Sequence, residues 1–308
     1  MQPDNSQLTH DSAFGQFKVG ANYWASHAGT NMWKYWQPEV VQDDFRQLAA
    51  EGLQVLRVFP LWPDFQPLSL AGSAGWQEVR MGELPLPDTP AGKAGISEEA
   101  MARFIWMADE AERTGLKLIV GLITGWMSGR LYVPPAFERI NVITDPFALK
   151  WQVRFVRYFV QALKDHPAIQ AWDLGNECNC MSWHVSRDEA WVWTSSIANT
   201  IRLSDPNRKI ISGMHSVTVS DYKGTWDMRD QGELTDVLTT HPYPPFTPYC
   251  DREPLNAMRN TLHGTAESRL YADISGRPCL CEEMGTLGPM FASQDTAKAF
   301  VRTALYSL

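Results

Sequence analysis

The sequence predicts an α/β protein, a (β/α)8 TIM barrel that ends before its eighth strand in this chain. Short apolar runs alternate with amphipathic helical stretches along the 308 residues, a pattern typical of parallel strands joined by helices. No run is followed by a Gly-x-Gly-x-x-Gly or Walker-type loop, which disfavours the open sheets that bind nucleotides. Seven strands with helices between them therefore favour a barrel.

The predicted strands are apolar, rich in β-branched residues and as short as buried parallel strands. In order they are Phe17–Tyr23, Gln54–Pro60, Leu116–Ile123, Ile169–Leu174, Lys209–Met214, Thr235–Thr240 and Pro278–Cys281. Since a closed barrel has eight strands, three explanations stay open. The sequence is truncated, another chain or segment supplies the last strand, or one strand escapes this count.

The predicted helices carry apolar residues on one face and end at ordinary stop signals. They are Glu39–Glu51, Ser97–Thr114, Phe147–Lys164, Ser186–Ser204, Glu253–Ile274 and a last helix from Ser293 onward. Asp145-Pro146 is typical of an N-cap with proline at the first helical position. The segment Leu61–Ile96 is rich in Gly, Pro and Ser and is too long for a plain connection. We expect it to form a loop excursion over the face of the barrel where binding residues collect.

Length, composition and charge limit the possible domain organisation and binding partners. We expect residues 1–15 to form an N-terminal tail and residues 16–308 to form one catalytic barrel domain, C-terminally incomplete if a strand is missing. Hydrophobic residues make up 44% of the chain, which allows a sizeable core, and the net charge of −8 makes nucleic acid a poor partner. No apolar run approaches the ~20 residues that span a bilayer. As it stands the chain predicts a cytoplasmic protein, or a secreted one if a signal peptide was removed.

The five cysteines predict neither a disulfide framework nor a metal centre. Their number is odd, and two pairs have the spacing Cys-x-Cys, Cys178 with Cys180 and Cys279 with Cys281. Structural zinc sites use Cys-x2-Cys instead. We therefore expect buried free thiols, no metal and no cofactor.

Carboxylates stand at the ends of the fourth and seventh predicted strands. Asn176-Glu177 follows the fourth, and Glu282-Glu283 follows the seventh. A charge at the end of a buried strand is costly unless it has a task, and barrel enzymes place their chemistry at these strand ends. Two carboxylates that face each other across the mouth are what glycoside hydrolysis needs.

Further motifs stand in the same order as in a known family: Arg57 on the second strand, and His241 and Tyr243 after the sixth. With the two carboxylate motifs, they resemble the clan A glycoside hydrolases, most closely family 5, which includes cellulases and β-mannanases. The resemblance covers essentially the whole chain. It implies a retaining mechanism in which Glu177 is the acid/base and Glu283 the nucleophile.

The resemblance also implies roles for the surrounding side chains. Arg57 and Tyr243 would hold the nucleophile ionised, Asn176 would donate to the sugar 2-hydroxyl, and His241 would bond a sugar hydroxyl or the acid/base. Two departures from the family pattern concern Met284, which replaces an aromatic residue, and the eighth strand, whose tryptophan forms the floor of the sugar site in the family.

Other residues are candidates without a forced role. The 13 tryptophans are many for this length, and indole faces can stack on sugar rings. Those that follow or flank strand ends are Trp24, Trp62, Trp126 and Trp183, and each could equally belong to the core. His215 follows the fifth strand and could line the site. Glu282 should face away from the pocket or pair with a cation, because adjacent strand residues point oppositely. Burial and the second carboxylate should raise the pKa of Glu177.

The leading hypothesis is a retaining β-glycoside hydrolase with a carbohydrate substrate, a β-mannoside, β-glucoside or β-galactoside. Leu61–Ile96 and the loop Thr124–Asn141 could close one end of the cleft and favour exo-action. The alternative is a carbohydrate-binding barrel that has lost turnover. A metal-dependent barrel hydrolase is a third reading, but the first strand offers Gly20-Ala21-Asn22 where such enzymes place His-x-His.

Overall fold

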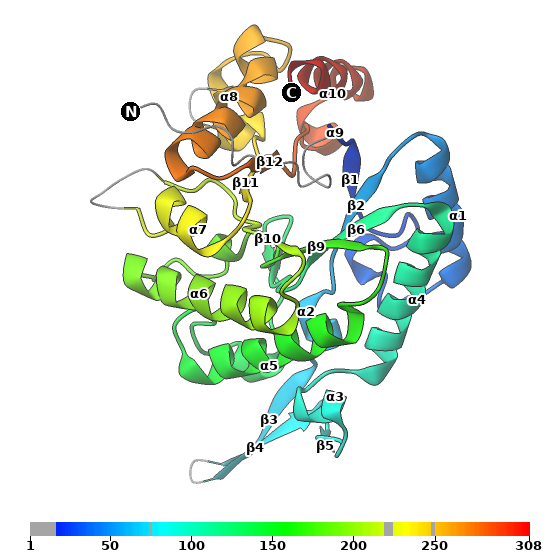
Figure 1. The fold of residues 1–308 in the computed structure, drawn as a ribbon, viewed down its shortest axis with the longest axis vertical. Coiled ribbons are helices and arrows are strands. Elements are labelled where there is room, and N and C mark those ends of the chain that lie inside the picture. The colour runs from blue at the N-terminus through cyan, green and yellow to red at the C-terminus, as the bar shows by residue number, and fades with distance from the viewer. Residues whose placement is uncertain (1–16, 74–75, 219–223, 248–249) are drawn as a thin grey trace.

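The computed structural model describes residues 17–73, 76–218, 224–247 and 250–308, and the predicted tail, residues 1–15, lies outside them. It confirms the α/β barrel class and each of the seven predicted parallel strands (Figure 1). These strands are β1 (Gly20–Tyr23), β2 (Val55–Val58), β6 (Lys117–Gly121), β9 (Ile169–Asp173), β10 (Lys209–Ile211), β11 (Leu238–Thr240) and β12 (Cys279–Cys281).

The strands follow one another in sequence order around a curved parallel sheet. Five form the order β1-β2-β6-β9-β10, and β11 pairs with β12. A parallel bridge from Ile211 to Val237 joins the two groups, and the Ser212 N–H donates to the Val237 carbonyl over 3.0 Å. Among the described residues, β1 pairs only with β2 and β12 only with β11. The sheet is therefore a seven-stranded barrel wall whose two outer edges do not pair with each other.

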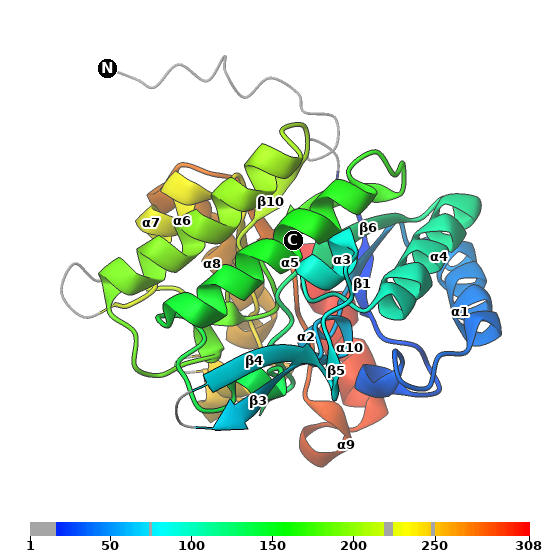
Figure 2. The same ribbon diagram turned by 90° about the horizontal axis from the view of Figure 1, so that it is seen from below.

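Helices cover the outside of this wall (Figures 1 and 2). The major ones are α1 (Pro38–Ala50), α4 (Glu98–Thr114), α5 (Pro146–Leu163), α6 (Arg187–Ser204), α7 (Met228–Leu234), α8 (Met258–Ser275) and α10 (Gln294–Ser307). Local chemistry fixes their ends: the Asp145 side chain caps α5, Ser186 and Glu189 form a capping box on α6, and Gly115 ends α4 in the left-handed conformation. The sequence did not predict α7. The helix α8 begins at Met258, five residues after the predicted start at Glu253.

The segment Leu61–Ile96 is not the loop that the sequence predicted. After the short helix α2 (Trp62–Phe65) it forms an antiparallel sheet of β3 (Leu68–Ser73), β4 (Trp76–Met81) and β5 (Leu84–Pro85), followed by α3 (Pro90–Lys93). The β3–β4 hairpin projects away from the barrel wall (Figure 1). Glycine and proline occupy its turns and helix starts, so a composition typical of loops here marks tight connections.

The loop Thr124–Asn141 carries structure of its own. It holds the two-residue strands β7 (Trp126–Met127) and β8 (Arg130–Leu131) and the 3-10 helix η3 (Pro135–Phe137). Leu61 bridges to Thr124, and β3 packs against η3. The two insertions therefore start side by side at the carboxyl ends of β2 and β6 and support each other.

The core lies between the sheet and its helices. Its largest fully buried side chains include Phe45, Phe104, Phe159, Trp172 and Trp193. All five cysteines are free thiols, as predicted, with Cys178 and Cys250 buried and the others half-buried. Within the described ranges, no helix is both long and apolar enough to cross a membrane.

Candidate active site

Glu177 follows β9 and has a backbone conformation that few residues other than glycine adopt. Its φ is 46° and its ψ 46°, in the left-handed region, just before the 3-10 helix η4 (Cys178–Cys180). The Glu177 N–H donates to the Gly213 carbonyl over 2.8 Å, so the loop after β10 holds this turn in place. Left-handed backbone in a non-glycine residue costs free energy and gathers at functional sites, which makes Glu177 a candidate on backbone grounds alone.

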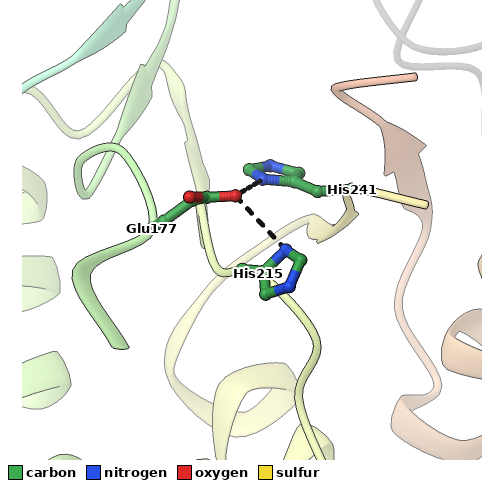
Figure 3. Close-up of side chains that lie close together, drawn as sticks. All are labelled: Glu177, His215 and His241. Carbon is green, nitrogen blue, oxygen red and sulfur yellow. Dashed lines mark hydrogen bonds and ion pairs between the residues drawn. The ribbon is translucent and has the colours of Figure 1, made fainter. Parts of the chain in front are cut away.

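Two histidines face the carboxylate of Glu177 (Figure 3). His241 Nδ1 lies 2.8 Å from Glu177 Oε1 in a hydrogen bond, and His215 Nδ1 lies 3.2 Å from the same oxygen. The His215 contact has the distance of an ion pair without hydrogen-bond geometry. Asn179 fixes the His215 backbone on both sides, because its amide donates to the carbonyl and accepts from the N–H.

These histidines overturn the expected pKa of Glu177. Burial alone would raise it, but the contacts from His215 and His241 hold the pKa of Glu177 below its ordinary value. The sequence analysis expected burial and the second carboxylate to raise this pKa, but the two imidazoles outweigh the effect of burial. Glu177 therefore gives up its proton more readily than a solvated glutamate.

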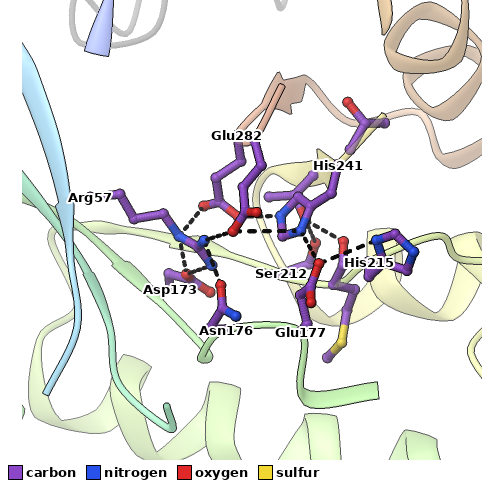
Figure 4. A network of polar contacts seen from close by, with 12 residues as sticks. Arg57, Asp173, Asn176, Glu177, Ser212, His215, His241 and Glu282 are labelled. Carbon is purple, nitrogen blue, oxygen red and sulfur yellow. Dashed lines mark hydrogen bonds and ion pairs between the residues drawn. The ribbon is translucent and has the colours of Figure 1, made fainter. Parts of the chain in front are cut away.

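Arg57, on β2 and 3% exposed, is the centre of a buried cluster of charges (Figure 4). Its Nε and Nη2 donate to Asp173 Oδ2 over 2.9 and 2.6 Å. Its Nη1 donates to Asn176 Oδ1 and to Glu283 Oε1, both over 2.8 Å. One guanidinium thus organises the ends of β9 and β12, using the fixed fork that suits Arg to carboxylates.

Glu283 receives a donor at each carboxylate oxygen. Arg57 reaches Oε1, and the Tyr243 hydroxyl donates to Oε2 over 3.1 Å. Burial and the adjacent anion raise the pKa of Tyr243 above its ordinary range, so its hydroxyl stays a donor. Glu283 is 11% exposed, which leaves a small face open to a ligand while the rest is held.

Asn176 lies at the same strand end and is 1% exposed. Its amide donates to the Trp126 carbonyl over 2.9 Å while its oxygen accepts from Arg57. The insertion that carries β7 is therefore tied directly to the charge cluster. Both ends of the amide that was expected to reach the sugar 2-hydroxyl therefore already have protein partners.

The structure separates the four tryptophans that the sequence grouped together. The prediction that Trp62 could stack on a sugar ring is wrong. Trp62 is fully buried, its indole N–H donates to Gln66, and it stacks on Phe137, so no face is left for a sugar. Trp24 is half-buried and stacks on Phe59 at 5.3 Å, and the guanidinium of Arg57 lies over the same Phe59 ring. Trp126 is half-buried beside Asn176, as described above. Trp183 is 81% exposed in the loop before α6.

Sequence reasoning missed one member of the cluster, Asp173, and left the role of Glu282 open. Asp173 is fully buried and the Glu282 side chain is 2% exposed, with Glu282 lying 3.1 Å from Arg57 and 3.0 Å from His241. Glu282 thus pairs with cations, one of the two outcomes expected for it. Burial, reinforced by Glu282 and opposed by Arg57, raises the pKa of Asp173 to about 7. The signal for Asp173 was present, since a carboxylate inside an apolar strand demands a buried partner.

A cavity of about 910 Å³ opens beside the cluster. Glu282, Glu283 and Tyr243 line one end, and the exposed edges of β1 and β12 with α8 and α10 line the rest. The unpaired side of the barrel wall is therefore continuous with the carboxylates.

Glu177, His215 and His241 could in principle hold a metal ion, because they offer three ligand atoms within 4.8 Å of one another. A metal ligand must be deprotonated. Burial opposes the charged form of His241, but Glu283 and the hydrogen bonds to Glu177 and Glu282 raise its pKa to about 10. The proton on Nδ1 thus competes with any metal at neutral pH.

The fold and the paired carboxylates are those of the class of (β/α)-barrel glycoside hydrolases. No protein-family model matches the chain. The chain is 25% identical over 199 residues to mannan endo-1,4-beta-mannosidase F of Aspergillus fumigatus, covering 63% of this chain and 44% of that protein. It is 27% identical over 284 residues to the probable mannan endo-1,4-beta-mannosidase F of Aspergillus oryzae, covering 85% and 57%. The chain thus spans about half the length of these relatives.

Solved structures show the same barrel. The GH5_18 protein of Streptomyces cattleya, in complex with Manb1-4GlcNAc, superposes with a TM-score of 0.80 at 21% identity, over 95% of this chain and 68% of that one. An exo-beta-1,4-mannosidase from Opitutaceae bacterium strain TAV5 has a TM-score of 0.75 at 24% identity, over 100% and 52%. These neighbours confirm the barrel fold that the resemblance to family 5 implied.

Proposed function

We propose that the chain is a retaining β-glycosidase that acts on β-mannosidic linkages, with Glu177 as acid/base and Glu283 as nucleophile. The observation that carries the proposal is that both carboxylates flank one ring nitrogen. His241 Nδ1 lies 2.8 Å from Glu177 Oε1 and 3.8 Å from Glu283 Oε1. The two oxygens therefore lie no further apart than the sum of these distances, which reaches only the lower edge of the ~6.5–9.5 Å of inverting enzymes.

The reaction proceeds in two displacements. Glu283 attacks the anomeric carbon while Glu177 gives a proton to the glycosidic oxygen, so the leaving group departs as an alcohol and the sugar becomes an ester of Glu283. Glu177 then takes a proton from water, and the hydroxyl attacks the same carbon and frees Glu283. Two inversions give net retention at the anomeric carbon.

The contacts of Glu283 support its assignment as nucleophile. Arg57 donates a hydrogen bond to one of its oxygens and Tyr243 to the other. These two bonds orient the carboxylate for attack. When the ester forms, the charge leaves Glu283 and Arg57 remains paired with Asp173. Arg57 therefore keeps a partner throughout the cycle.

The relatives support mannose as the sugar. The fungal relatives are named mannan endo-1,4-beta-mannosidases, and the structural neighbours include an exo-beta-1,4-mannosidase and a protein bound to Manb1-4GlcNAc. We place the chain with the exo-acting or short-oligosaccharide enzymes, because the insertions after β2 and β6 support each other and one of them is tied to Asn176. We expect such an arrangement to close one end of the cleft.

The test is hydrolysis of nitrophenyl β-mannoside, β-glucoside and β-galactoside, of manno-oligosaccharides and of Manβ1-4GlcNAc. We expect turnover of mannosides and release of mannose from one chain end. Glu283→Gly should abolish turnover, and azide should restore it with formation of the inverted azido-sugar. Glu177→Ala should keep activity on the nitrophenyl substrate, whose leaving group needs no proton, and azide should then give the azido-sugar of retained configuration.

Two outcomes would overturn the proposal. Full turnover by Glu283→Gly would contradict the assignment of Glu283 as nucleophile. A preference for a β-glucoside or β-galactoside over the mannoside would contradict the proposed substrate. The alternative of a barrel that only binds sugar gains no support from the site, because both carboxylates are present with ordered partners. Binding without hydrolysis of any substrate would revive it.

A further inference from the structure

Five side chains at the site form a chain of alternating charge (Figure 4). In order they are Glu283, Arg57, Glu282, His241 and Glu177, with successive contacts of 2.8, 3.1, 3.0 and 2.8 Å. The two proposed catalytic carboxylates stand at its ends. The middle member, Glu282, contacts a cation on each side.

Glu282 is placed to act on these cations rather than on a sugar. Its side chain is 2% exposed, one oxygen facing Arg57 and the other facing His241. Oε1 contacts Arg57 at ion-pair distance, and Oε2 is hydrogen-bonded to His241. The simplest alternative is that Glu282 and Arg57 form a buried ion pair that only stabilises the fold. That alternative does not account for the second contact of Glu282, to His241.

The His241 ring has a carboxylate at each nitrogen. Nδ1 contacts Glu177 Oε1 and Nε2 contacts Glu282 Oε2, at hydrogen-bond distance in both cases. A neutral imidazole carries one N–H, so it can donate to only one of two carboxylates. Both contacts are satisfied together only when His241 is an imidazolium, and the ring itself is fully buried.

We propose that Glu282 is a positioning residue for the acid/base: it fixes the ring of His241 and keeps both ring nitrogens protonated, so that Glu177 always faces a cation. This inference rests on the proposed function of Glu177. In retaining chemistry the acid/base must return to its anionic form to activate water, and a neighbouring cation favours that form.

Several charged and titratable side chains surround the ring of His241. Glu177 from the end of β9, Glu282 and Glu283 after β12, and His215 after β10 face the ring, whose centroid lies 6.1 Å from that of His215. The protons of His241 and Glu177 bind as a coupled pair, because the two groups share a hydrogen bond. Removing the Glu282 anion that contacts His241 weakens the binding of the His241 proton.

The substitution that tests the inference is Glu282→Gln, which keeps the shape and removes the charge. The basic limb of the pH profile of kcat/KM on nitrophenyl β-mannoside should move to lower pH by about 1–3 units, the usual effect of one neighbouring charge. Glu282→Asp keeps the charge on a shorter stem, so it should lower kcat yet leave the basic limb near that of wild type. A merely structural role predicts lower activity with no movement of the limb.

Glu110→Gln is the matched control. Glu110 is also a buried glutamate, 2% exposed on α4 and paired with Arg113 and Gln42. This substitution should change the free energy of unfolding and leave the pH profile unchanged. It separates the loss of any buried charge from the loss of this one.

A second readout needs no turnover. In protein labelled with ¹⁵N-histidine, the His241 signals, identified by their loss in His241→Asn, should report both ring nitrogens protonated at pH 8 in wild type and one in Glu282→Gln. A neutral His241 in wild type, or the same titration in both proteins, would overturn the inference. Absence of hydrolysis with the expected ¹⁵N result would instead count against the proposed function alone.

Discussion

Arg57 donates from Nη1 to Oε1 of Glu283 over 2.8 Å, although 226 residues separate the two in sequence. Arg57 stands on β2 and Glu283 follows β12, so this contact spans the unpaired side of the barrel wall, where β1 and β12 do not pair with each other. A side-chain ion pair thus fixes the last described strand to the start of the sheet. The position of the proposed nucleophile depends on it.

Arg57→Met should therefore destabilise the protein and abolish activity. The substitution leaves Asp173, Glu282 and Glu283 without their shared cation, and removing one partner of a buried ion pair typically costs about 3–5 kcal/mol. Urea unfolding measures this loss. Arg80→Met provides the control, because Arg80 pairs with Glu78 at the surface and such pairs contribute about 0–1 kcal/mol. Equal losses in the two variants would contradict the central role of Arg57.

Tyr243→Phe should lower kcat/KM by about 10- to 100-fold, the equivalent of the 1.5–3 kcal/mol of a hydrogen bond to a charged group. The hydroxyl donates to Glu283 Oε2 and so orients that carboxylate. Tyr271→Phe is the matched control, since the Tyr271 hydroxyl is buried against the Val217 backbone. It should lower stability and leave kcat/KM unchanged. Comparable kinetic loss in both variants would mean that Tyr243 acts only through the fold.

The sequence predicted the barrel and the strand-end carboxylates because both follow from local pattern. Every predicted strand is present, and the motif at Asn176-Glu177 lies where parallel strands end. The partners of His241 could not be predicted in this way. Its two contacts come from Glu177, 64 residues earlier, and Glu282, 41 residues later, and only the closed fold brings them together.

The same limit explains the errors. Trp62 follows a strand end, as a sugar platform would, but the chain turns at once into α2 and buries the indole against Gln66 and Phe137. Burial and the second carboxylate were expected to raise the pKa of Glu177, yet the two histidines lower it. Whether a strand-end residue faces the cleft depends on the dihedral angles of the next two residues, and composition does not reveal these.

Gly213→Ala should damage the site more than Gly52→Ala, although both glycines have a positive φ. Gly213 has a φ of 61°, and an added Cβ would lie 1.9 Å from Asp173 Oδ1 and 2.2 Å from the Gly175 carbonyl oxygen. Gly52→Ala is the control, with a φ of 90° and open space around the new atom. Gly52→Ala should cost only the backbone strain, about 1–3 kcal/mol. Gly213→Ala should cost more and should lower kcat/KM, because the Gly213 carbonyl holds Glu177.

Stability should fall as the pH rises from 7 to 10. Against the opposing effect of burial, the surrounding carboxylates raise the folded-state pKa of His241 from 6.5 to about 10. Its stabilisation is therefore fully present below the unfolded pKa and is lost as the pH rises through the folded pKa. Asp173, whose pKa is raised from 3.8 to about 7, has the same sign at lower pH. Glu177, whose pKa is lowered, loses its contribution only in acid.

The measurement is urea unfolding of wild type and His241→Asn at several values between pH 7 and 10. Above about pH 8 Asp173 is already ionised, so His241 titrates alone among those three groups there, and the wild type should lose at most about 1.4 kcal/mol per pH unit relative to the variant. Parallel curves for the two proteins would show that His241 is neutral throughout.

Trp24→Ala and Trp62→Ala should have opposite effects on binding and stability. Trp24 is half-buried and stacks on Phe59 next to Arg57, so its loss should raise KM by about 2- to 10-fold, the equivalent of an aromatic contact of 0.5–1.5 kcal/mol. Trp62 is fully buried, and its truncation should cost about 3–5 kcal/mol of unfolding free energy. At a temperature where the Trp62 variant stays folded, its KM should match that of wild type. A raised KM in the Trp62 variant alone would instead mean that the buried indole shapes the sugar site from below.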